Sequence, residues 1–195
     1  MPKNIIISYI NINSIRNKIK DLEILISELV DVLTIAETKI DESFPTSQFL
    51  LNNFKRPYRL DVSDKREGLM TYVRTDIPSR VVKEFRFPSD IQILAIELNV
   101  KKTRWLLLSI YRNPKQNLSY FLKCLSEAML FYSRYDSILI NGDFNEEPSN
   151  PELKQFLACY QLHNHMKEKT CWKSCDYKVD NMLEIFLVLD YLAPH

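Results

Sequence analysis

Several apolar, strand-like segments of the chain end in polar residues that could act together chemically. Asn11 follows the first such segment, Glu37 follows the second, and Asp143 and Asn145 follow a later one. Tyr111 ends a further segment. Because parallel strands place their carboxyl ends at one edge, where open α/β sheets bind ligands, we expect these side chains to converge. The predicted site thus combines two carboxylates, two amides and a phenol.

The chemistry that this set suits is hydrolysis of a phosphodiester with a hard divalent cation. Mg²⁺ prefers oxygen ligands and is held by one or two carboxylates with water and substrate phosphate, a set that Glu37 and Asn11 would supply. Asp143 could orient or deprotonate an attacking water. Asn145, Asn11 and Tyr111 could hydrogen-bond the phosphoryl oxygens as charge develops on them. Alone, each residue has an ordinary structural explanation as a turn residue or a solvated strand end, so the joint placement carries the prediction.

The elements that must position these residues follow from apolar periodicity. Residues 4–10 predict a strand, residues 15–29 a helix with Asn13 or Ser14 as N-cap, and residues 32–36 a second strand. This βαβ pattern implies parallel pairing with a right-handed crossover. Further strands are predicted at 58–62, 69–74, 81–87, 91–100, 104–111 and 137–141, and further helices at 118–132 and 151–160. We expect an α/β fold, one domain over residues 1–195 in which two packed sheets carry helices on the outside.

Composition limits the partners. The 195 residues have a formal net charge of +1, so binding to nucleic acid needs a local basic surface. The candidates are Arg16, Lys18 and Lys20, and Lys101, Lys102 and Arg104. No apolar run approaches the roughly 18 residues of a membrane span, and the N-terminal apolar stretch is too short for a signal peptide. We therefore expect an intracellular location, nucleus or cytoplasm, with no membrane partner and with reduced cysteines.

The two glycines, Gly68 and Gly142, are too few for a glycine-rich phosphate loop. Gly142 is expected to permit a tight turn that aims the residues after it over the sheet edge. A zinc site is an alternative centre, because two histidines and two cysteines fall close together, at His163, His165, Cys171 and Cys175. Cys-x₃-Cys is an admissible spacing, but His-x-His followed by Cys is unusual for structural zinc. Loop histidines and small buried cysteines are the other explanation.

Four motifs resemble, in order and spacing, the endonuclease/exonuclease/phosphatase superfamily, and most of all the apurinic-type endonuclease domains of non-LTR retrotransposons. They are residues 8–16 (SYININSIR), 36–39 (AETK) with 41–45 (DESFP), 110–114 (IYRNP) and 141–145 (NGDFN). The resemblance spans about residues 4–174 and implies a four-layer α/β sandwich. It also implies cleavage of DNA through contacts to the phosphate backbone, with Mg²⁺ or Mn²⁺ and no small-molecule cofactor.

The resemblance also assigns roles to residues. Asn11 and Glu37 match metal-site positions, and Tyr111, Asp143 and Asn145 match catalytic and phosphate-contacting positions. The expected substrate-binding residues are Asn13, Arg112, Thr170 and Asp180. The sequence carries no signal for an oligomeric state.

The chain departs from the family pattern near its C-terminus. No Ser-Asp-His motif follows Asp180, and the segment 190–195 has the wrong spacing to replace it. Residues 176–195 therefore resemble a degenerate or truncated end, which predicts incomplete C-terminal strands, an unpaired sheet edge near the centre and reduced or lost activity. A DNA-nicking endonuclease, a phosphatase or lipid phosphodiesterase, and a non-catalytic remnant are the three functions that remain open.

Overall fold

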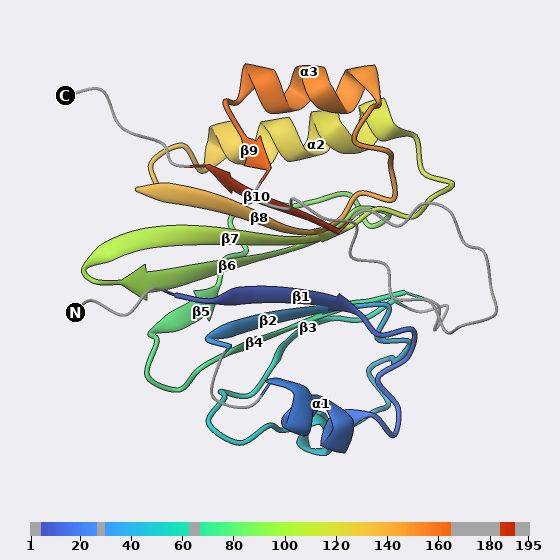
Figure 1. Ribbon diagram of the computed structural model, residues 1–195, viewed down its shortest axis with the longest axis vertical. Coiled ribbons are helices and arrows are strands. Elements are labelled where there is room, and N and C mark those ends of the chain that lie inside the picture. The colour runs from blue at the N-terminus through green and yellow to red at the C-terminus, as the bar shows by residue number, and fades with distance from the viewer. Residues whose placement is uncertain (1–4, 27–29, 63–66, 165–183, 190–195) are drawn as a thin grey trace.

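The computed structural model describes residues 5–26, 30–62, 67–164 and 184–189. Two β-sheets lie face to face, with α1 (Ile19–Ile26) on the outer face of the first and α2 (Leu118–Phe131) and α3 (Pro151–Cys159) on the outer face of the second (Figure 1). The order helix, sheet, sheet, helices is the four-layer α/β sandwich that the sequence predicts.

The first sheet has four strands in the order β1-β2-β4-β3. They are β1 (Ile7–Asn11), β2 (Val32–Ala36), β4 (Leu69–Val73) and β3 (Tyr58–Leu60). β1 and β2 are parallel, so Asn11 pairs with Ala36, while β4 is antiparallel to β2 and begins at the end where β2 finishes. The carboxyl ends of β1 and β2 and the start of β4 therefore share one edge.

The second sheet has six strands in the order β5-β6-β7-β8-β10-β9. They are β5 (Ser79–Val81), β6 (Gln92–Val100), β7 (Thr103–Tyr111), β8 (Ser137–Asp143), β10 (Glu184–Leu189) and β9 (His163–Asn164). β7 and β8 are parallel, which pairs Tyr111 with Asp143 at their carboxyl ends. β6 is antiparallel to β7, so its first residue, Gln92, lies opposite Tyr111.

Three buried apolar clusters hold the layers together. One lies between the sheets and includes Leu94, Leu107 and Leu139, a second joins α1 to the first sheet, and a third joins α2 and α3 to the second sheet. The helices on the second sheet begin at Asn caps: the Asn117 side chain accepts from the Tyr120 N–H, and Asn150 caps α3 ahead of Pro151. Such caps satisfy N–H groups that have no partner inside the helix.

The structure differs from the predicted elements at three places. The first helix begins at Ile19 rather than residue 15, because residues 13–17 form a turn with positive φ at Asn13, Ser14 and Asn17. The strand predicted at 81–87 is β5, Ser79–Val81, and the residues after it leave the sheet so that Phe85 and Phe87 pack on the α2 side. An unpaired sheet edge was expected near the centre, but β10 pairs with residues 138–143 of β8.

Among the described residues, no helix combines the length and the apolar character that crossing a membrane requires.

Candidate active site

The polar strand ends of the two sheets meet at one end of the sandwich. Asn11 and Glu37 come from the first sheet, and Tyr111 and Asp143 come from the second. The Tyr111 hydroxyl joins the sheets directly, because it donates to Glu37 Oε1 at 3.2 Å. Nearby, the Gly68 N–H at the start of β4 donates to Gln92 Oε1 at the start of β6.

Glu37 is the centre of this arrangement. It follows β2 directly and has φ of 52°, so the chain turns sharply where the carboxylate leaves the strand. Asn11 Nδ2 donates to Glu37 Oε1 at 2.8 Å, alongside the Tyr111 hydroxyl. The Lys39 ammonium lies 3.4 Å from the other oxygen, Oε2. One carboxylate thus receives an amide, a phenol and an ammonium group.

Tyr111 keeps its proton at neutral pH. Burial raises the pKa of its hydroxyl well above the ordinary value, and the negative charges of Glu37, Glu67 and Asp143 raise it further. The side chain is 5% exposed. Tyr111 is therefore a hydrogen-bond donor in a site that carries several carboxylates.

Asp143 and Asn145 lie in a turn that is held by the neighbouring strand. The Asn145 N–H donates to Asp143 Oδ1 at 2.6 Å, and Asn145 Nδ2 donates to the Arg112 carbonyl at 2.8 Å. Asn145 has φ of 46° and provides the bend that was expected at Gly142. Gly142 instead lies inside β8, where a Cβ would approach the Ile110 carbonyl oxygen to 2.0 Å. Close backbone approach, and not a turn, is the reason for this glycine.

Arg112 has a different place from the one predicted. Its side chain is 3% exposed, and its guanidinium donates to the carbonyls of Phe144, Asn145 and Gln116 and pairs with Glu146. In this geometry Arg112 holds the turn that carries Asp143 and Asn145, and its donors point at protein oxygens. Of the other predicted substrate-binding residues, Asn13 is exposed beside the site and its Oδ1 accepts from Lys39. Thr170 and Asp180 lie outside the described residues.

Sequence reasoning missed four residues that the structure brings to the site. Lys39 is close in sequence, two residues after Glu37, and its position inside the AETK motif was the available signal. The other three form a cluster that ties the start of β4 to the second sheet: the Glu67 carboxylate accepts from Gln92 Nε2 and Asn113 Nδ2. No local spacing indicates that cluster, because its members come from three separate loops and strand ends.

The two basic clusters lie at opposite ends of the sandwich. Arg16 and Lys18 belong to the turn after β1, where Lys18 Nζ donates to the Ile12 carbonyl at 2.6 Å. Lys101 and Lys102 form the β6–β7 turn, at the other end of β7 from Tyr111. The length of β7 places Lys101 and Lys102 roughly 25 Å from Tyr111. The β6–β7 cluster is thus too far away to contact a phosphate that lies at Glu37.

Glu37 and Asn11 carry functional groups of the type that a hard divalent cation binds. Glu37 supplies a carboxylate, which already faces the positive charge of the Lys39 ammonium. Asn11 carries an amide whose nitrogen donates to Glu37 and whose oxygen accepts from the Asn13 N–H. Within the described ranges, no group of three or more His, Cys, Asp or Glu side chains is placed to hold a metal ion. An ion at Glu37 would therefore depend on water and substrate oxygens for its remaining ligands. The zinc alternative lies outside the described residues, apart from the backbone of His163 in β9.

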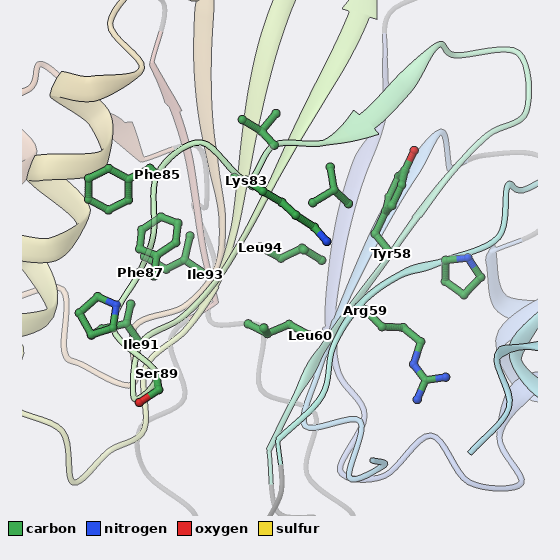
Figure 2. Close-up of a pocket in the computed structure, with 15 residues that line it drawn as sticks. Tyr58, Arg59, Leu60, Lys83, Phe85, Phe87, Ser89, Ile91, Ile93 and Leu94 are labelled. Carbon is green, nitrogen blue, oxygen red and sulfur yellow. The ribbon is translucent and has the colours of Figure 1, made fainter. Parts of the chain in front are cut away.

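A groove of about 540 Å³ lies along the edges of both sheets. β3 residues such as Tyr58 and Leu60 form one side, and Phe85, Phe87 and Ile91 form the other (Figure 2). None of the converging strand-end residues lines it. Most of the side chains that line the groove are apolar.

Comparison with known proteins identifies the fold. The model of the endonuclease/exonuclease/phosphatase family matches residues 9–190. The chain belongs to this family. A search of curated protein sequences gave no match.

Solved structures of the same fold include several nucleic-acid enzymes. The endonuclease domain of TRAS1, a telomere-specific non-LTR retrotransposon, is similar with a TM-score of 0.65 at 12% identity, over 92% of this chain and 82% of that domain. An AP endonuclease from Archaeoglobus fulgidus has a TM-score of 0.61 at 16% identity, over 95% of this chain and 86% of that protein. A 3′ phosphatase from Neisseria, solved with a product DNA hairpin, has a TM-score of 0.53 at 18% identity. The match covers 74% of this chain but only 59% of the Neisseria protein.

Proposed function

We propose that the chain is a divalent-metal-dependent phosphodiesterase that nicks DNA, of the retrotransposon endonuclease type. The observation that carries this proposal is the convergence on Glu37 of Asn11, Tyr111 and Lys39, drawn from both sheets. The DNA substrate is supported by similarity to the TRAS1 endonuclease domain and to the Neisseria phosphatase solved with DNA.

Each residue has a role that its position supports. Glu37 and Asn11 would hold Mg²⁺ or Mn²⁺, which supplies a Lewis acid for a phosphoryl oxygen. Tyr111 is protonated at neutral pH, and its single hydroxyl proton, which it donates to Glu37 here, would turn to a phosphoryl oxygen as negative charge develops there. Asp143 orients or deprotonates the attacking water, and Asn145 and Asn11 bind phosphoryl oxygens.

The residues around this core position it and meet the substrate. Arg112 holds the turn of Asp143 and Asn145 from behind, as a positioning residue. Asn13 and Lys39 lie at the exposed rim beside Glu37, where the DNA backbone would approach. Thr170 and Asp180 stay proposed substrate contacts on the family resemblance alone.

Plasmid nicking tests the function directly. The purified chain should convert supercoiled plasmid to the nicked form with Mg²⁺ and fail to do so with EDTA. Glu37→Gln should lower the rate at least about 100-fold, because the amide cannot supply the charge that holds the cation. Glu127→Gln, the same change on an exposed position of α2, is the matched control and should leave the rate unchanged.

Two outcomes would contradict the proposal. Nicking that persists in EDTA or in Glu37→Gln would exclude a metal held at Glu37. An absence of nicking after prolonged incubation, with intact Mg²⁺ binding by calorimetry, would instead favour the non-catalytic remnant.

We further propose that the 195 residues by themselves turn over slowly. They contain no Ser-Asp-His motif after Asp180, and general acid–base assistance is worth roughly 10² to 10⁴ in rate. A chain extended with an intact Ser-Asp-His segment should nick plasmid at least about 100-fold faster. Equal Mg²⁺-dependent rates of the two chains, each abolished by Glu37→Ala, would show that the 195 residues are catalytically sufficient.

A further inference from the structure

A cluster of three hydroxyls lies in the middle of the interface between the two sheets. We call it the cross-sheet hydroxyl cluster, and it consists of Thr34 on β2, Thr71 on β4 and Ser109 on β7. All three side chains are 0% exposed. Ser109 Oγ lies 2.9 Å from Thr34 Oγ1 and 3.0 Å from Thr71 Oγ1, and the two threonine oxygens are 3.4 Å apart. Each hydroxyl can therefore donate once and accept once within a closed ring.

Two of these three hydrogen bonds cross from one sheet to the other. Thr34 and Thr71 are paired neighbours in the first sheet, whereas Ser109 belongs to the second. Asn141, which pairs with Ser109 on β8, adds a further crossing bond, because its Nδ2 donates to the Ser8 carbonyl of β1 at 3.3 Å. The hydroxyls and this amide form a polar layer in an interface that otherwise consists of the apolar cluster around Leu94, Leu107 and Leu139.

The polar layer lies directly below the candidate active site. Ser109 precedes Tyr111 by two residues on β7, and Asn141 precedes Asp143 by two residues on β8. Thr34 lies on β2, three residues before Glu37, which directly follows that strand. Two residues along a strand correspond to about 7 Å, so the cluster is the nearest buried layer beneath the groups that face the substrate.

The site depends on the relative position of the two sheets. Glu37 and Asn11 belong to the first sheet, while Tyr111, Asp143 and Asn145 follow strands of the second. Apolar packing has no directional preference and tolerates small shifts between sheets, whereas hydrogen bonds fix both distance and angle. A misplacement of about 1 Å in a catalytic arrangement can cost about 100-fold in rate.

We propose that Ser109 and Thr34, with Thr71, are positioning residues that fix the register between the two sheets and so hold Tyr111 against Glu37. The proposal rests on the proposed function for its kinetic effect, and on the Tyr111–Glu37 hydrogen bond for its structural effect. According to this proposal, buried residues that touch neither metal nor substrate contribute to the geometry of the site.

Substitutions at Thr34 separate positioning from folding. Thr34→Val keeps the shape but removes the hydroxyl; Thr71 and Ser109 can still bond each other, so the melting temperature should stay within about 2 °C. Thr34→Ser keeps the hydroxyl but deletes a core methyl, which should lower the melting temperature by about 2–4 °C. The nicking rate should fall about tenfold in Thr34→Val and stay near wild type in Thr34→Ser. Ser109→Ala removes both crossing hydroxyl bonds and should lower the rate by about 10- to 100-fold.

Metal affinity and a core control complete the kinetic test. Because Glu37 and Asn11 share the first sheet, Mg²⁺ affinity by calorimetry should change less than about twofold in Ser109→Ala, while the rate falls. Ile96→Val, which removes a methyl from the same inter-sheet core, should lower the melting temperature and leave the rate unchanged. A rate that follows the melting temperature across Thr34→Val, Thr34→Ser and Ile96→Val would overturn the proposal.

A spectroscopic readout keeps the inference testable if the wild-type chain does not nick DNA. The tyrosine ¹³Cζ resonance of Tyr111, identified by its loss in Tyr111→Phe, reports the hydrogen bond to Glu37. It should shift in Ser109→Ala and Thr34→Val, and stay unchanged in Thr34→Ser and Ile96→Val. An unshifted Tyr111 resonance in Ser109→Ala would overturn the proposal whether or not the chain is an active nuclease.

Discussion

Individual side chains at the strand ends act through charge and burial together. Tyr111 illustrates this, because burial and the nearby charges of Glu37, Glu67 and Asp143 all raise the pKa of its hydroxyl. The Lys39 ammonium offsets part of that negative charge at Glu37 Oε2. The site therefore presents a hydroxyl donor that stays protonated and a carboxylate that faces the Lys39 ammonium.

Arg112 supports the site from within the protein, and its replacement should be costly. Burial lowers the pKa of its guanidinium, and the paired Glu146 opposes that change. Arg112→Lys keeps the charge but cannot reach three carbonyls and a carboxylate at once. We expect the free energy of unfolding to fall by about 3 kcal/mol or more, measured by urea denaturation. Arg56→Lys, an exposed control, should change it by less than about 0.5 kcal/mol, and similar small losses in both variants would contradict the assigned role.

At the scale of elements, the parallel pair β7–β8 carries half of the site. Its register places Tyr111 beside Asp143 and pairs Gly142 with Ile110, whose backbone lies against the position that a Gly142 Cβ would take. Gly142 has φ of 154°, and the space that a Cβ would need is occupied by the Ile110 carbonyl. The glycine at this strand end thus allows the backbones of β7 and β8 to lie close together.

Gly142→Ala should disturb this pair. A methyl group there would force β8 away from β7, so we expect a loss of about 2–4 kcal/mol in the free energy of unfolding. Ile140→Val, two residues earlier in the same strand, should cost only about 0.5–1.5 kcal/mol. Equal stabilities of the two variants in urea denaturation would show that β8 can shift without cost.

At the scale of the whole molecule, the sandwich buries several tyrosines, and the pKa values of their hydroxyls are raised. Burial is the main cause of the raised pKa values of Tyr72, Tyr111, Tyr132 and Tyr135, and that of Tyr135 is raised to about 12. Each of these hydroxyls is protonated in the folded chain at a pH where the unfolded chain has lost the proton.

Stability should therefore decrease in alkali. Above the ordinary tyrosine pKa of 10.0 the unfolded chain binds fewer protons than the folded chain, so the free energy of unfolding falls as pH rises. Urea denaturation at pH 8 and pH 11 should show the loss, and Tyr135→Phe should reduce its slope. A free energy of unfolding that is constant from pH 8 to pH 11 would contradict the raised pKa values.

Much of the fold could be predicted because its signals are local. Apolar runs of strand length and helical periodicity are set by neighbouring residues, and they predicted α2, α3, β2, β6 and β7 to within about two residues. The turn at residues 13–17 was not predictable in this way, because its positive φ values depend on hydrogen bonds from Ser14 and Ile15 to the carbonyls of Glu37 and Thr38. The pairing of β10 with β8 joins segments that are more than forty residues apart, which no local pattern specifies.

By itself, the sequence determined which residues stand at the strand ends, because alternation and turn chemistry place Asn11, Glu37, Tyr111 and Asp143 there. Only the tertiary structure decided which of these ends meet and what surrounds them. It brought Tyr111 to Glu37 across the sheets, buried Arg112 behind the turn, and gathered Glu67, Gln92 and Asn113 beside the site. The physical reason is that strand periodicity fixes positions along one sheet, whereas the register between two sheets depends on packing and on buried hydrogen bonds such as those of Ser109.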